Sequence, residues 1–124
     1  MVSDDWTVER HLADKSDVVR DLYCRFIDLV EACGPFTYNV TMTAISLKGT
    51  RRGFAGAKPK AQTLDGYLDL QQVVRDPRIL RSSPYTQRLF VHQFRITSAG
   101  QLDERFAGWV REAYEVGAGA HIAD

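Results

Sequence analysis

The chain has 124 residues, of which 44% are hydrophobic and 26% charged, so it has the size and composition of one ordinary globular domain that needs no metal or disulfide. No apolar run approaches the roughly 20 residues of a membrane helix, and the acidic start 1–5 is unlike a secretory signal, so we expect a cytoplasmic protein without membrane contact. The formal net charge is zero, but residues 32–101 carry ten bases against three acids, while both ends of the chain are acidic.

Two helices are predicted at the start of the chain. Thr7 has the side chain of an N-cap and precedes a short helix of about two turns. Ser16 caps a longer helix that opens with Asp17, a negative charge that suits the positive end of the helix dipole. The apolar residues of this second helix recur every three or four positions and form one stripe, and Gly34 ends it.

The periodicity then changes, and the central part of the chain is typical of strands. Residues 37–48 are rich in β-branched side chains, but their apolar parity shifts, which indicates a bulge or two short strands. Residues 52–58 and 64–70 are the next predicted strands, the second with clear alternation of apolar and polar residues. The proline-containing and serine-containing stretch 71–87 is predicted to be a connection, and 88–97 to be the longest strand.

The last element is a helix over residues 102–116, followed by a flexible C-terminal tail over residues 117–124. Neither a linker nor an internal repeat divides the sequence, so we expect a single domain over residues 3–116. The order of helix, helix, strands and helix predicts an α+β domain of two layers. Its antiparallel sheet should have four to five strands, with the helices packed on one face.

The stretch 52–55, Arg-Gly-Phe-Ala, begins as the RNA-reading strand of an RRM domain begins. That motif needs aromatic rings at its fifth and eighth positions, where this chain has Gly56 and Pro59. An RRM also starts with a strand, whereas this chain starts with helices. RNA reading by this mechanism is therefore disfavoured, and nucleic acid ranks below a small anionic molecule as a ligand.

The basic stretch 48–60 holds no acidic residue and supplies three candidate ligand-binding residues, Arg51, Arg52 and Lys58. Guanidinium groups held near a turn can bind a phosphate or a carboxylate through charge-assisted hydrogen bonds. A solvated hairpin kept soluble by its charges would explain the same residues. Both interpretations stay open, and both expect positive charge to gather over the strand region.

Tyr67 and His92 complete the candidate binding set, as residues that would shape a pocket beside those cations. His92 shares its strand parity with apolar residues, and a histidine on such a face is more often a hydrogen-bonded core residue. His11 and His121 lie far away in the sequence, so no metal site is predicted. The glycines match neither a P-loop nor a dinucleotide fingerprint, so no cofactor is predicted. The sequence contains no recognisable set of nucleophile, base and oxyanion hole, so it favours a protein that is not an enzyme.

Several stretches resemble a known family. They are Trp6–Leu12, Lys15-Ser16, Leu22-Tyr23, Arg51–Ala55 with Pro59, Asp103, Trp109 and Ala113-Tyr114. Together they resemble the uncharacterised bacterial family called domain of unknown function 5655, over nearly the whole chain. The resemblance implies a small α/β domain of the broader YdhG-like type, with helices against an antiparallel sheet. It implies no known reaction, cofactor or substrate, so no residue acquires a role from it.

Two functions remain open. In the first, the chain is a binding module whose basic sheet surface holds an anionic ligand. In the second, it is a structural or homo-oligomerising module, in which the acidic helices of one chain, or of a partner, meet the basic strand region of another.

Overall fold

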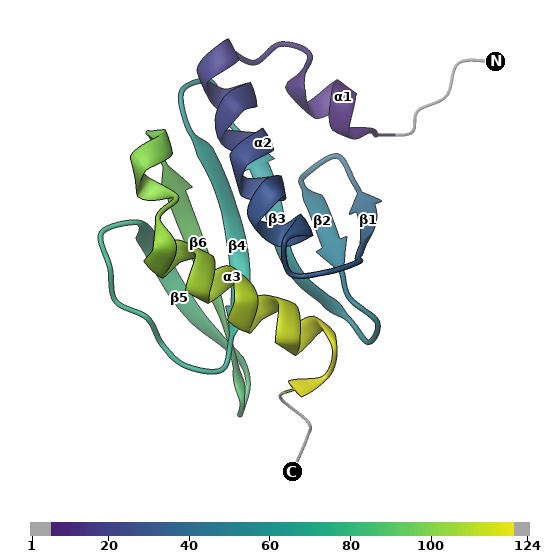
Figure 1. Ribbon diagram of the computed structural model, residues 1–124, viewed down its shortest axis with the longest axis vertical. Helices are drawn as coiled ribbons and strands as arrows, with labels where there is room; N and C mark the ends of the chain where they lie inside the picture. Colours follow the sequence, from purple (N-terminus) through teal and green to yellow (C-terminus); the bar gives the residue numbers. More distant parts are fainter. Residues whose placement is uncertain (1–5, 121–124) are drawn as a thin grey trace, which may run out of the picture.

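The computed structural model describes residues 6–120, so the acidic start of the chain, His121 and the end of the predicted tail lie outside the described residues. Helices and strands follow one another along the described part as shown in Figure 1. In chain order they are α1 (Val8–Leu12), α2 (Asp17–Glu31), β1 (Thr37–Val40), β2 (Ile45–Lys48), β3 (Gly53–Pro59), β4 (Leu64–Leu70), β5 (Ile79–Thr86), β6 (Leu89–Ile96), the 3₁₀ helix η1 (Ala99–Gln101) and α3 (Glu104–Gly117).

The strands form one antiparallel sheet in the order β1-β2-β3-β4-β6-β5. The predicted α+β class is confirmed, but the predicted four to five strands are wrong, because the described residues form a six-stranded sheet. The strand that the sequence did not reveal is β5, which lies in the stretch predicted to be a connection. Pro84 and its serine neighbours gave a turn signal, yet β5 is an edge strand, where a residue without an N–H is tolerated.

The helices α2 and α3 lie side by side over one face of the sheet (Figure 1). Both begin as capped helices: Ser16 accepts a hydrogen bond from the Val19 N–H, and Asp103 accepts one from the Phe106 N–H. Neither these helices nor any other in the described part of the chain is long and apolar enough to cross a membrane.

Three phenylalanine rings join the two layers. Phe26 of α2 lies 5.5 Å from Phe94 of β6 and 6.3 Å from Phe106 of α3, measured between ring centroids, and the last two rings are 5.2 Å apart. All three side chains are fully buried. Aromatic pairs at these separations stabilise a core beyond the effect of burying their area.

Strand β4 has the alternation that the sequence indicates. Leu64, Leu68 and Leu70 are fully buried against the helices. Successive side chains of a strand point to opposite faces, so Asp65, Tyr67 and Asp69 point to the other side. We call the side of the sheet opposite α2 and α3 the open face.

Gly66 of β4 leaves no room for a side chain. A Cβ at this position would overlap the carbonyl oxygen of Gly56 and lie 2.5 Å from Cζ of Phe94. We therefore expect Gly66→Ala to lower the free energy of unfolding, measured by urea denaturation, by about 1–3 kcal/mol. Gly100→Ala is the control, because a Cβ there meets nothing within 4 Å, and its effect should stay within about 0.5 kcal/mol. Equal effects of the two substitutions would contradict the close packing around Gly66.

Candidate functional site

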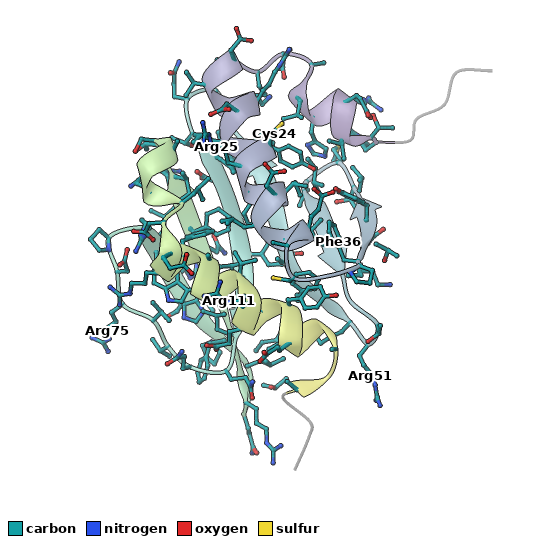
Figure 2. All side chains as sticks on the ribbon, in the orientation of Figure 1. Cys24, Arg25, Phe36, Arg51, Arg75 and Arg111 are labelled. Atoms are coloured by element: carbon teal, nitrogen blue, oxygen red, sulfur yellow. The ribbon has the colours of Figure 1, made fainter. Side chains whose placement is uncertain are left out.

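The structure brings together three of the five residues proposed from the sequence. Arg52 and Tyr67 line one groove on the open face, and the ammonium of Lys58 lies 5.9 Å from the centroid of the Tyr67 ring. Arg51 is exposed on the loop between β2 and β3, and its side chain extends away from the body of the molecule (Figure 2). The backbone of that loop is fixed, because the Arg51 N–H donates to the carbonyl oxygen of Gly117 at the end of α3.

His92 lies on the other side of the sheet, in the core. It pairs with Leu68 in the register of β4 and β6, whereas the neighbouring Tyr67 points to the open face. Its Nε2 accepts a hydrogen bond from the Val74 N–H at 2.8 Å, so Nδ1 carries the proton and donates to the carbonyl oxygen of Phe90 at 3.0 Å. Burial lowers the pKa of this imidazole, which favours the neutral form that these two bonds require. These contacts explain His92 as a core residue, and we leave it out of the proposed site.

Carboxylates of the same chain pair with several arginines of the predicted basic surface. Arg52 Nη2 lies 2.7 Å from Asp69 Oδ2, and Arg95 holds Asp65 with two hydrogen bonds of 3.0 and 2.8 Å. Arg95 and Asp65 are directly opposite each other in the register, which is the cross-strand pairing expected for such residues. The positive charge available on the open face is therefore smaller than the composition of residues 32–101 suggests.

Arg78 is also removed from that surface. It is only 9% exposed, and its guanidinium donates to Asp76, to Asp103 and to the carbonyl oxygen of Gln101. The same guanidinium lies 4.8 Å from the centroid of the Trp109 ring. Hydrogen bonds from Arg78 lower the pKa of Asp76 to about 2. These bonds tie the connection between β4 and β5 to the start of α3, so Arg78 has a structural role.

Two lysines of the basic stretch, Lys58 and Lys60, line a cavity of about 370 Å³ that we call the cationic pocket. Its walls come from α1 and the turn after it, from the turn between β1 and β2, and from the end of β3. Four cationic side chains and one carboxylate are among its residues, which are Trp6, Arg10, His11, Asp14, Lys15, Met42, Thr43, Lys58, Pro59 and Lys60.

Hydrogen bonds hold the short helix α1 in place beside this pocket. His11 Nε2 lies 2.7 Å from the carbonyl oxygen of Thr41, which ties α1 to the turn between β1 and β2. Arg20 of α2 donates to the carbonyl oxygens of Leu12 and Ala13 at 3.0 and 2.9 Å, which satisfies the end of α1. A helix of five residues would not persist alone, so these tertiary contacts determine the shape of the pocket.

The cations of the pocket differ in their partners. The guanidinium of Arg10 lies 4.0 Å from the centroid of the Trp6 ring, and Lys15 pairs with Asp14 at 2.6 Å. Among residues 6–120, no carboxylate lies within ion-pair distance of Lys58 or Lys60. The pocket therefore contains two lysines that form no ion pair with a described carboxylate, although Asp65 is near enough to interact electrostatically with Lys60.

A second cavity, of about 430 Å³, lies on the open face, and we call it the tyrosine groove. Its residues are Arg52, Gly53, Tyr67, Asp69, Tyr85 and Val91. The guanidinium of Arg52 lies 5.2 Å from the centroid of the Tyr85 ring, and the hydroxyl of Tyr67 donates to Ser46 Oγ at 3.1 Å. The Tyr67 ring crosses directly over Gly56, the position at which an RRM strand would carry its own aromatic ring.

Asp69 is the most unusual group of the tyrosine groove. It is 4% exposed, and its Oδ1 is buried without a hydrogen-bond partner among the described residues. Burial raises the pKa of this carboxyl group to about 6, although Arg52 acts in the opposite direction. An unsatisfied buried oxygen costs free energy, and a donor from an ordered water or from a ligand would remove that cost.

Sequence reasoning missed most of the cationic pocket. Lys60 belongs to the same basic stretch as Lys58 and lies two residues further along the chain, which could have paired them. The contributions of α1 gave no such signal, because more than 40 residues separate Lys15 from Lys58. Within the described part of the chain, no cluster of three or more histidine, cysteine or acidic side chains could hold a metal ion.

Comparison with known proteins gives a family. A family model described as "Domain of unknown function (DUF5655)" matches residues 8–117, which includes every helix and strand from α1 to α3. No curated protein and no solved structure matches the chain. The chain therefore belongs to the domain of unknown function 5655 family.

Proposed function

We propose that this domain binds a small anionic molecule in the cationic pocket. The observation that carries the proposal is the presence of Lys58 and Lys60 in one cavity without a described carboxylate at ion-pair distance, beside Arg10 and Lys15. Like charges gathered in one cavity repel each other, and a bound anion converts that repulsion into attraction.

The chemistry of the pocket suits a phosphate-type anion. Ammonium groups on flexible stems act as point charges toward phosphate oxygens, and charge-assisted hydrogen bonds are roughly twice as strong as neutral ones. The cavity is small enough for a metabolite. The hydrogen bond between His11 and Thr41 ties α1 to the turn between β1 and β2, so the backbone around the pocket needs little ordering when a ligand binds.

The proposed site lies at the end of β3 beside α1, and not over the middle of the sheet as the sequence suggests. Of the predicted binding residues, Lys58 belongs to the cationic pocket, while Arg52 is already paired with Asp69. Arg51 lies on a different loop, and His92 lies in the core. Binding of an anion at the pocket therefore depends on Lys58, Lys60 and the α1 region.

The test is a calorimetric titration with pyrophosphate at low ionic strength. We expect the double variant Lys58→Ala/Lys60→Ala to bind at least about tenfold more weakly than the unmodified chain, since one charge-assisted bond contributes about 1.5–3 kcal/mol. The matched control is Lys48→Ala/Arg51→Ala, which removes the same charge from two exposed residues outside the pocket and should bind nearly normally.

Equal losses in both double variants would show that only overall charge matters, and would contradict the proposal.

The oligomerising function, in which acidic helices meet a basic strand region, requires a second copy or a partner. Sedimentation over a wide concentration range separates it from ligand binding, because ligand binding at this pocket requires no change in the oligomeric state.

A further inference from the structure

The tyrosine groove and the cationic pocket are neighbours on the molecule, connected by Lys58. The Lys58 side chain belongs to the cationic pocket, and its ammonium lies 5.9 Å from the centroid of the Tyr67 ring, which belongs to the groove. Lys58 pairs with Asp65 in the register of β3 and β4, and Asp69 lies four residues further along β4. At the rise of an extended strand, the two ends of this surface are therefore about 13 Å apart.

The groove offers different chemistry from the pocket. Tyr67, Tyr85 and Val91 supply aromatic and aliphatic surface, while Arg52 and Asp69 place a donor and an acceptor side by side. Tyr85 is 64% exposed, so its ring is available for stacking with a ligand. A flat group with apolar faces and a polar edge fits such a lining, because aromatic side chains stack on planar heterocycles.

One carboxylate oxygen of Asp69, Oδ1, lacks a hydrogen-bond donor among the described residues. One of its carboxylate oxygens binds Arg52 at 2.7 Å, and the other is buried without a partner. An N–H or amino group on the edge of a heterocycle supplies such a donor, and the remaining N–H groups of Arg52 supply one for an acceptor on the same edge. Nucleobases carry donors and acceptors side by side on one edge.

From these three observations we infer that the anionic ligand of this domain is a nucleoside phosphate. Its phosphate occupies the cationic pocket, and its base occupies the tyrosine groove, where it stacks on the tyrosines and meets Asp69 and Arg52. The inference rests on the proposed function, since it names the class of anion that the pocket binds.

The test compares ligands that share a phosphate but differ in the base. Ribose 5-phosphate, the four ribonucleoside 5′-monophosphates and the corresponding nucleosides are titrated into the full chain by calorimetry. We expect at least one nucleoside monophosphate to bind about tenfold or more tightly than ribose 5-phosphate, which is the size of one base–aromatic stacking contact. The variant Tyr85→Ala should remove that difference and leave the affinity for ribose 5-phosphate unchanged.

Tyr38→Ala is the matched control, because Tyr38 is also a well-exposed tyrosine but lies on β1 on the opposite side of the sheet from the groove. It should leave both affinities unchanged, and Lys58→Ala/Lys60→Ala should weaken both. If ribose 5-phosphate binds as tightly as every nucleotide, the inference is overturned while the proposed function stands. If neither kind of ligand binds, the inference is overturned, and the titration with pyrophosphate decides whether the proposed function stands.

Discussion

Replacing Arg78 by alanine is expected to lower the free energy of unfolding by about 3–5 kcal/mol, which is typical for breaking a buried ion pair from one side. The carboxylate of Asp76 is only 6% exposed, and Arg78 donates to both of its oxygens. Without the guanidinium, Asp76 keeps a buried charge, and the carbonyl oxygen of Gln101 loses its donor. Urea denaturation at pH 7 measures the change.

Arg105→Ala is the control for this experiment. Its guanidinium contacts the same carboxylate at 3.3 Å, but the side chain is 62% exposed. Exposed ion pairs contribute less than about 1 kcal/mol, so Arg105→Ala should have a small effect. If the two substitutions destabilised the domain equally, burial would not be the reason that the hydrogen bonds of Arg78 stabilise the domain.

Asp69→Asn is expected to change how stability depends on pH. The pKa of Asp69 is raised in the folded state to about 6 from an ordinary value of 3.8, so the folded protein holds this proton more tightly than the unfolded chain does. The stability that this group contributes is therefore greatest below pH 4 and is lost as the pH rises through 6. The difference in unfolding free energy between the unmodified chain and Asp69→Asn should fall by roughly 3 kcal/mol from pH 4 to pH 7.

Asp65→Asn gives the matched comparison, since Asp65 is also on β4, also buried and also paired with an arginine. Burial acts to raise the pKa of Asp65, but hydrogen bonds from Arg95 and Thr63 outweigh it, so the pKa is lowered. The contribution of Asp65 is therefore present above its ordinary pKa of 3.8 and is lost only at lower pH. Urea denaturation at several pH values should show no fall for Asp65→Asn between pH 4 and pH 7, and a fall of the same size would contradict the distinction between the two carboxylates.

The fold could be predicted where local chemistry and periodicity agree. Ser16 caps α2 as expected, and the alternation in β4 places its leucines in the core. Strand β5 could not be predicted, because its serine and proline residues are ordinary turn formers and only pairing with β6 makes them a strand. The position of a strand at the edge of a sheet depends on how all the strands pair, so a local sequence pattern does not predict it.

The candidate site was predicted in part, and the reason lies in pairing between distant residues. Arg52 and Asp69 are 17 residues apart, so composition counts a free cation where the fold makes an ion pair. Lys58 was recognised from its basic neighbourhood, whereas Trp6 and Lys15 join it through the tertiary contacts that hold α1 in place. Charge layout along a chain thus indicates which segments are basic, and the tertiary structure decides which of their charges remain available.

An anion bound at the cationic pocket should change the environment of the backbone amides around it, which a titration with pyrophosphate followed by backbone amide chemical shifts detects. We expect saturable shifts that concentrate in residues 10–15, 41–43 and 58–60, which lie in or next to the lining of the pocket. Small shifts spread over all basic segments, or shifts centred on the loop that carries Arg51, would contradict it.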